Sequence, residues 1–156
     1  MNNKLVIREY QNSDLIQVLD LHKKAMEEIN AYKGDGPWDD DLKNIIKNYS
    51  NNFGLFLVGL IDNKIIAMGA FRKIDKNVAE IKRMRTYPEY QGKGYGKMIL
   101  DELIKFAKEL NYKELILETS DKQIVAKKLY ANFGFIEFKK ENIDGFNCTW
   151  YKLILL

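Results

Sequence analysis

The chain has 156 residues, the size of one domain with a sizeable hydrophobic core. Hydrophobic residues make up 46% and charged residues 30% of the sequence, and no apolar run approaches the ~20 residues of a membrane span, so the composition is that of a soluble globular protein. The net charge of +3 is spread over interleaved lysines and acidic residues, which argues against a nucleic-acid partner.

The first third of the sequence predicts a strand followed by two helices. Residues 4–10 alternate as a strand does, and Asn12-Ser13-Asp14 offers N-cap chemistry for a helix. Gly34-Asp35-Gly36-Pro37 ends that helix, and residues 39–49 predict a short second helix. We expect the first helix to bury one face, made of Leu15, Leu19, His22, Met26 and Ile29.

The rest of the sequence predicts six more strands and two more helices. Asp62-Asn63 and Asp144-Gly145 are hairpin-turn signals. The order β-α-α-β-β-β-α-β-α-β-β predicts an α/β fold with a mixed sheet, in one domain spanning residues 1–156. Strands are expected at residues 55–61, 64–73, 78–86, 114–119, 135–139 and 148–155, and helices at 97–110 and 124–132; the longer helix has an apolar face of Ile99, Leu103, Phe106 and Leu110.

A glycine-rich loop, Gln91-Gly92-Lys93-Gly94-Tyr95-Gly96-Lys97, joins a strand to a helix. Glycine lets the backbone approach a ligand, and the helix start offers free N–H groups and a positive dipole end, so the loop predicts a phosphate site. The dinucleotide fingerprint is excluded because Lys97 stands at its last glycine. The P-loop is excluded because Gln91 and Met98 replace its first glycine and its hydroxyl residue.

Two motifs carry a family resemblance. Gln91-x-x-Gly94-x-Gly96 resembles motif A of the GNAT superfamily of N-acetyltransferases, which cradles the pyrophosphate of acetyl-coenzyme A. Ala126-x-x-x-Tyr130-x-x-x-Gly134-Phe135 resembles motif B, although Gln123 stands where the family usually has Asn. The element order is also that of the GNAT fold. The resemblance implies direct acetyl transfer from acetyl-coenzyme A to a primary amine of a small molecule or peptide, and it allows a homodimer.

The resemblance also implies a set of coenzyme-binding residues. Backbone N–H groups at residues 84–86, near the end of a splayed strand, are expected to bind pantetheine and polarise the thioester carbonyl. The expected set is Met84, Arg85, Thr86, Gln91, Gly92, Lys93, Gly94, Tyr95, Gly96, Lys97, Gln123 and Ala126.

Two residues are expected to be catalytic. Tyr130 matches the family's general acid, which protonates the thiolate, although its ring could also simply pack in the core. Glu80 is the expected base, because it lies four residues before Met84 and positions i and i+4 share a strand face. The alternatives are a surface charge paired with Lys82 or Arg83, and ordered water acting as the base.

Trp38 and Glu80 are the expected substrate-binding residues. Trp38 is flanked by carboxylates that could receive a cationic amine beside its ring, or could instead cap the second helix. These carboxylates are Asp35, Asp39, Asp40 and Asp41.

The remaining candidates carry less chemistry. Nothing in the sequence indicates that Cys148 and His22, each the single residue of its type, meet as a catalytic pair or hold zinc, so we expect no disulfide and no metal. The N-terminus shows no signal peptide, which favours a cytoplasmic protein without a membrane partner. The alternative functions are a non-catalytic coenzyme A-binding module and a nucleic-acid-binding protein that uses the lysine-rich loop.

Overall fold

A computed structural model describes residues 4–156. The expected α/β class is confirmed: seven strands form one mixed sheet in the order β1-β2-β3-β4-β5-β7-β6. The elements are β1 Val6–Glu9, η1 Asn12–Asp14, α1 Leu15–Glu28, η2 Pro37–Asn44, η3 Ile46–Ser50, β2 Leu55–Ile61, β3 Lys64–Lys73, β4 Val78–Thr86, η4 Pro88–Tyr90, α2 Tyr95–Glu109, β5 Glu114–Ser120, α3 Ile124–Asn132, β6 Ile136–Ile143 and β7 Phe146–Ile154.

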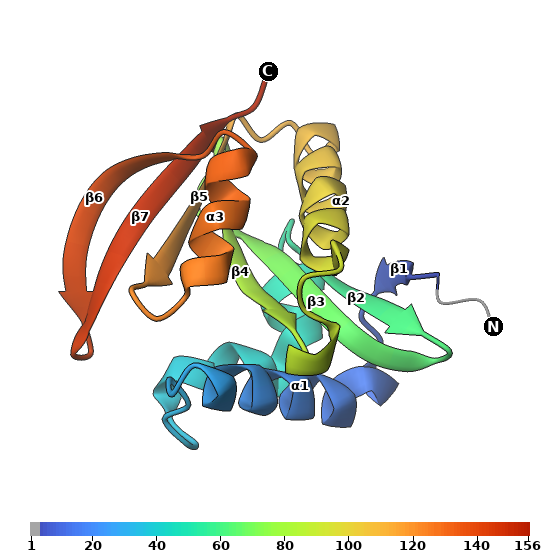
Figure 1. The fold of residues 1–156 in the computed structure, drawn as a ribbon. Coiled ribbons are helices and arrows are strands. Elements are labelled where there is room, and N and C mark those ends of the chain that lie inside the picture. The colour runs from blue at the N-terminus through green and yellow to red at the C-terminus, as the bar shows by residue number, and fades with distance from the viewer. Residues whose placement is uncertain (1–3) are drawn as a thin grey trace.

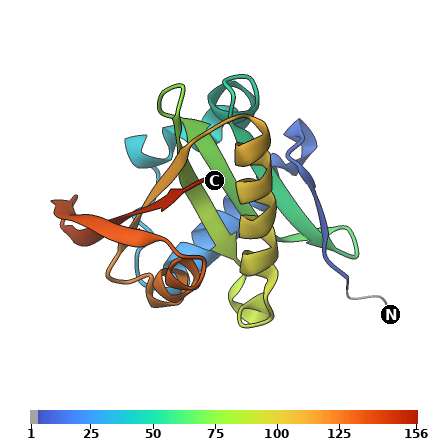
Figure 2. The same ribbon diagram turned by 90° about the horizontal axis from the view of Figure 1, so that it is seen from above.

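Helices cover both faces of the sheet. Figures 1 and 2 show α1 crossing one face, while α2 and α3 lie on the other. The close packing of α2 depends on Gly69 of β3, because a Cβ there would lie 2.4 Å from Sδ of Met84 and 2.7 Å from Ile99. Both hairpin turns form as expected, with positive φ at Asp62-Asn63 and at Asp144-Gly145.

The two inward-facing sides of the long helices differ from the expectation. In α1 the buried residues are Val18, Leu21, His22 and Ala25, and Leu19 is 43% exposed. In α2 Ile99 and Leu103 are buried as expected, but Leu100 and Ala107 complete the face while Phe106 and Leu110 lie at the surface. The expected second helix forms as a 3-10 helix, η2, followed by a short π-helix, η3, rather than as one α-helix. The expected faces contained large apolar residues, whereas the small Ala25 and Ala107 are buried because they let each helix approach the sheet.

The centre of the sheet opens between β4 and β5. These parallel strands pair only from Val78–Glu80 to Glu114–Ile116, and Figure 1 shows them diverging beyond that point. Residues 81–86 of β4 therefore have no ladder partner on this side. Backbone donors at the end of β4 are available to a ligand.

A β-bulge interrupts β4 beside this opening. Lys82 pairs with Ala70 and Arg85 pairs with Met68, so Arg83 and Met84 together oppose Gly69. Arg83 takes up the irregularity with φ of 60°, a left-handed conformation that is uncommon for arginine. Compared with a regular strand of the same number of residues, the bulge puts every later side chain of β4 on the opposite face.

Candidate active site

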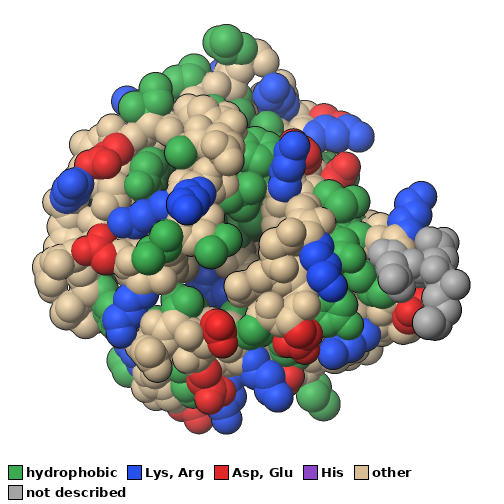
Figure 3. Space-filling view, in the orientation of Figure 1, with side chains coloured by type: hydrophobic (Ala, Val, Ile, Leu, Met, Phe, Trp, Pro, Cys, Tyr) green, Lys and Arg blue, Asp and Glu red, His purple; other side chains and the backbone are tan. Residues whose placement is uncertain are grey.

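One cavity lies beside the glycine loop, and we call it the loop cavity. It has a volume of about 490 Å³ and lies between the end of β4, the start of α2, α3 and the end of α1. Figure 3 shows this face of the molecule hollowed between α3 and the loop that precedes α2, with basic and hydrophobic side chains around the hollow. Its position at the opening between β4 and β5 gives a ligand access to the free strand end.

Glycines shape the wall of the loop cavity that faces α2. Gly92 and Gly94 have φ of 77° and 86°, and Gly94 is the N-cap of α2. The first helical bond runs from the N–H of Met98 to the carbonyl of Gly94, so the N–H groups of residues 95–97 begin the helix without an intrahelical acceptor. No atom lies within 4 Å of a Cβ built on Gly92 or Gly94, so the loop leaves open space for a phosphate group.

The expected coenzyme-binding residues come together here. All of them line the loop cavity except Lys93, whose ammonium group lies 5.5 Å from the ring centre of Tyr90. Gln123, which replaces the usual Asn, accepts a hydrogen bond from the N–H of Ser120 through Oε1 at 2.9 Å. That contact braces the β5–α3 loop, and within residues 4–156 the amide nitrogen of Gln123 makes no side-chain hydrogen bond.

A second cavity adjoins the first, and we call it the inner cavity. Its volume is about 350 Å³, and its walls come from α1, η2, β4, β5 and β7 together with the segments beside them. The two cavities share Met26, Met84, Arg85, Gln123 and Tyr130. A molecule in one cavity therefore meets a molecule in the other at these residues.

Tyr130 lies at this junction. Its side chain is buried, and its ring packs edge-on against Phe135 with the ring centres 5.7 Å apart. Burial raises the pKa of Tyr130 above that of an ordinary tyrosine, although the positive charge of Arg85 opposes the shift. The residue thus combines both expected properties, a packed ring and a hydroxyl that stays protonated beside the cavities.

Glu80 is buried in the wall of the inner cavity and is held by Arg72. Its Oε1 accepts a hydrogen bond from Nε of Arg72 at 2.9 Å and forms an ion pair with Nη2 of Arg72 at 2.8 Å. The expectation that Glu80 shares a strand face with Met84 is wrong, because the bulge intervenes and Glu80 shares its face with Arg85 instead. Pairing with Lys82 or Arg83 is also not observed; a role as base or substrate ligand stays a prediction.

The aspartates around Trp38 hold Arg83. Asp41 accepts from Nε and Nη2 of Arg83 at 3.0 and 2.5 Å, and Asp39 accepts from Nη1 at 2.9 Å. This cluster of ion pairs explains how the unusual backbone of Arg83 is stabilised. Among the described residues neither carboxylate makes a helix-capping hydrogen bond, so that expectation is wrong; both are engaged by the guanidinium group, and a role in receiving an amine stays a prediction.

Trp38 lines the inner cavity and is 44% exposed. Its Nε1 donates to the carbonyl of Gly34 at 3.1 Å, and the ammonium group of Lys33 lies 5.4 Å from its ring. The ring rests on Gly36, where a Cβ would come within 2.5 Å of it. The ammonium group of Lys33 already lies over one face of the indole, so a role of Trp38 in binding a substrate stays a prediction.

His22 and Cys148 both line the inner cavity, although nothing in the sequence indicates that they meet. Nε2 of His22 lies 3.1 Å from Oδ2 of Asp39, and burial together with Arg85 and Arg83 lowers the pKa of His22 to about 4. Burial and the nearby Glu118 raise the pKa of the Cys148 thiol to about 11. A neutral imidazole bonded to Asp39 and a protonated thiol do not form an activated nucleophile pair.

Sequence reasoning missed two side chains that face the inner cavity. Glu118 of β5 lines it, and within residues 4–156 its carboxylate makes no ion pair. Arg85 was expected to act through its backbone only, yet its guanidinium group also lines the cavity. The alternation of β5 puts Glu118 opposite the buried Leu117, but only the pairing of β5 with β7 shows which face borders a cavity.

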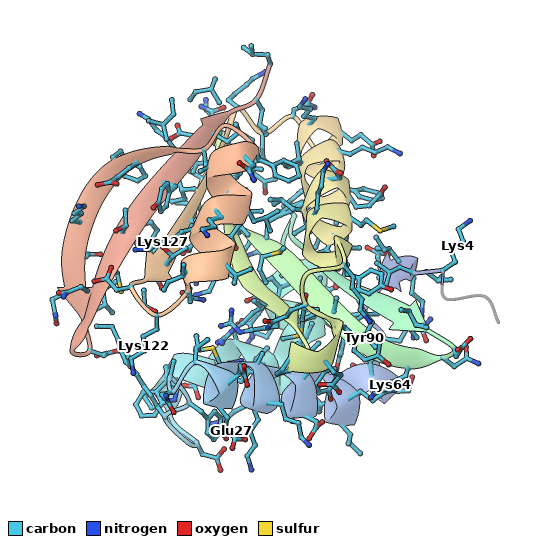
Figure 4. All side chains as sticks on the ribbon, in the orientation of Figure 1. Lys4, Glu27, Lys64, Tyr90, Lys122 and Lys127 are labelled. Carbon is cyan, nitrogen blue, oxygen red and sulfur yellow. The ribbon has the colours of Figure 1, made fainter. Side chains whose placement is uncertain are left out.

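Lys122 connects the two sides of the opening. Its ammonium group donates to the carbonyl of Asn30 at 2.7 Å, and Figure 4 shows it extending from the β5–α3 loop toward the end of α1.

Among residues 4–156 no group of three or more His, Cys, Asp or Glu residues is arranged to bind a metal ion. Across the same range, none of the helices has the length and apolarity to span a membrane.

Solved acetyltransferases share this fold. An acetyltransferase of the GNAT family from Staphylococcus aureus Mu50 superposes with a TM-score of 0.90 at 28% identity, over 98% of this chain and 100% of that one. The PaiA N-acetyltransferase from Thermoplasma acidophilum, solved in complex with coenzyme A, gives a TM-score of 0.78 at 23% identity over 97% and 99% of the two chains. The fold is therefore that of an acetyltransferase.

The family follows from the sequence comparison. The sequence profile described as Acetyltransferase (GNAT) family matches residues 16–135. The chain belongs to this family. Human N-acetyltransferase 8 is 28% identical over 122 residues, which cover 74% of this chain and 52% of the human protein. The chain spans about half the length of the curated relatives it matches first.

Proposed function

We propose that the protein is an acetyl-coenzyme A-dependent N-acetyltransferase that transfers the acetyl group directly to a primary amine of a small molecule or peptide. The observation that carries the proposal is the meeting of two cavities at Tyr130 and Arg85, at the open end of β4. Membership of the GNAT family supports acetyl transfer, as do the names of its relatives. Direct transfer holds donor and acceptor together, which can lower the barrier by up to about 7–11 kcal/mol.

The loop cavity fits the coenzyme. The open space at Gly92 and Gly94, beside the free N–H groups that begin α2, suits a pyrophosphate group. Residues 84–86 would hold the pantetheine arm and the thioester oxygen through their backbone donors, as the separation of β4 from β5 allows. The relative from Thermoplasma acidophilum is named as a complex with coenzyme A, which supports this assignment. We propose no metal ion.

The reaction moves one acetyl group and one proton. The carbon–sulfur bond of the thioester breaks and a carbon–nitrogen bond to the amine forms. The hydroxyl of Tyr130 would protonate the leaving sulfur, and its raised pKa keeps the proton in place at neutral pH. Cys148 takes no part, because its protonated thiol is a weak nucleophile.

The amine must lose a proton, and two carboxylates of the inner cavity are candidates for the base. Glu80 is the candidate from the sequence, but its Oε1 is already engaged by the guanidinium group of Arg72. Glu118 lines the same cavity without an ion pair among the described residues. We therefore propose Glu118 as the base and keep Glu80 as the alternative. A homodimer and a cytoplasmic location stay predictions.

Free-thiol release tests the proposal. Purified protein is incubated with acetyl-coenzyme A and a panel of amines, amino acids and peptides, and calorimetry measures coenzyme binding in parallel. We expect acceptor-dependent thiol release and a matching acetylated product by mass spectrometry. Tight coenzyme binding without turnover of any acceptor would instead indicate a non-catalytic binding module. Salt-sensitive RNA or DNA binding without coenzyme binding would indicate the nucleic-acid-binding alternative.

A further inference from the structure

The inner cavity brings together eight charged side chains, of which five have a partner. Arg83 is held by Asp39 and Asp41, Glu80 by Arg72, and Lys33 by Asp144 at 3.5 Å. The eight are Lys33, Lys82, Arg83, Arg85, Asp39, Glu80, Glu118 and Asp144. Within residues 4–156, Lys82, Arg85 and Glu118 make no ion pair. Two cations and one anion thus face the cavity without an ion pair among the described residues, although the charges of Asp39 and Glu118 act on Arg85 from a longer distance.

Arg85 is the least satisfied of the three. Its Nη1 donates to the carbonyl of Met84 at 2.9 Å, whereas its Nε is buried and has no acceptor in the described part of the chain. Buried donors without an acceptor are few in native proteins and call for an explanation. Burial and the charge of Arg83 lower the pKa of Arg85 to about 10, so the guanidinium group remains charged at neutral pH. The missing acceptor is therefore best supplied by an anion.

The bulge in β4 aims this guanidinium group. If β4 continued as a regular strand with all its residues, Arg85 would point toward α2; because of the bulge, Arg85 lies on the same strand face as Glu80 and Lys82. Arg85 also borders both cavities, next to Tyr130. An anion that binds Arg85 therefore lies close to the site of acetyl transfer, a position that fits an anionic group of the acceptor itself.

The chemistry of the unpaired groups identifies this anion. A guanidinium group offers parallel donors that match the two oxygens of a carboxylate. Glu118, in the same cavity, offers a negative charge to an ammonium group. We propose that the acceptor is an α-amino acid or a closely related aminocarboxylate, whose carboxylate binds Arg85 while its amino group faces Glu118. The inference rests on the proposed acetyl transfer and names the substrate class for it.

Matched acceptors test the inference. Standard L-amino acids and the corresponding L-amino acid amides are compared by thiol release at saturating acetyl-coenzyme A. We expect at least one amino acid to exceed its amide in kcat/KM by about tenfold or more, since each tenfold step is about 1.4 kcal/mol of differential binding. Arg85→Gln should remove this preference by raising KM for the amino acid, with the amide changed less than about twofold. Arg85→Lys should restore part of the preference, because it keeps the charge without the paired donors.

Lys127→Gln is the matched control. Lys127 pairs with Asp121 outside both cavities, so this variant removes one positive charge without touching the site. It should keep the preference for the amino acid. Equal use of acid and amide by the unchanged protein would overturn the inference, as would a similar loss for both acceptors in Arg85→Gln. Weakened acetyl-coenzyme A binding in Arg85→Gln, with an unchanged preference, would assign Arg85 to the coenzyme and overturn it as well.

Failure of the proposed function has a separate signature. If no acceptor releases thiol, calorimetric titration of amino acids and amides into the coenzyme A-bound protein decides the matter. Binding of amino acids but not amides, lost in Arg85→Gln, would keep the inference while the proposed acetyl transfer fails. Turnover of simple amines but of no aminocarboxylate would keep the acetyl transfer and reject the inference. If neither acids nor amides bind, the inference is wrong.

Discussion

The loop cavity and the inner cavity are built in different ways. One wall of the loop cavity is mainly backbone: two glycines with positive φ and the N–H groups that begin α2. The inner cavity is lined by charged side chains from widely separated parts of the chain. A backbone site of this kind recognises the phosphate that all acyl-coenzyme A molecules share, whereas a side-chain site can differ between relatives with the same fold.

Three substitutions test this division between the cavities. The largest effect is expected at their junction, where Tyr130→Phe should lower kcat by about 100-fold, the low end for loss of a general acid, with little change in coenzyme affinity. Because the pKa of Tyr130 is raised, the unchanged protein should keep its acid through pH 9 to 10, where an ordinary tyrosine begins to ionise. Rate measurements against pH check both points, and an unchanged kcat in the variant would remove Tyr130 from the mechanism.

An intermediate effect is expected on the backbone side. Gly94→Val should weaken acetyl-coenzyme A binding by about 30-fold. A β-branched residue at φ of 86° carries strain of about 2 kcal/mol, and this strain disfavours the loop conformation that binds the coenzyme. Gly96→Ala is the matched control, since its φ is ordinary and its Cβ would lie 3.6 Å from Leu129. Calorimetry of both variants separates strain from simple bulk. Normal binding by Gly94→Val would contradict the proposed phosphate cradle.

The smallest of the three effects is expected on the side-chain side. Glu118→Gln should lower kcat/KM by about tenfold at pH 7, and the loss should shrink as rising pH deprotonates the amine in solution. Glu80→Gln is the comparison, because its carboxylate is already engaged by Arg72. A steep pH dependence in Glu80→Gln, with a normal profile in Glu118→Gln, would return the role of base to Glu80.

Local features of the molecule could be predicted from the sequence, whereas contacts between distant residues could not. The hairpin at Asp62-Asn63, the strands on either side of it and the glycine loop are local patterns, and the structure contains each of them, although α2 begins at Tyr95, two residues before the expected start at residue 97. The role of Asp39 and Asp41 depends on Arg83, which lies more than 40 residues away along the chain. No local sequence pattern predicts that contact. The cavity-facing position of Glu118 likewise depends on the pairing of β5 with β7.

Helix faces show a second limit of the sequence. Phe106 and Leu110 fit the apolar period of α2 but lie at the surface, where Ala107 takes the buried position. Periodicity gives the direction of an apolar stripe only to within about one residue, because several neighbouring positions satisfy the same period. The short distance between α2 and the sheet then favours a small residue, Ala107, at the buried position.

The bulge at Arg83 and Met84 sets the face on which each later side chain of β4 lies. If β4 kept all its residues but continued as a regular strand, Arg85 would be driven into the apolar packing of α2, and Met84 would lose its place beside Gly69 and Ile99. Loss of Arg83, by contrast, would leave Met84 opposite Gly69 and Arg85 opposite Met68, so the strand would become regular with both side chains on their present faces. Family members with this cavity should therefore have either the bulge or a strand shorter by one residue, and not a regular strand of the same length.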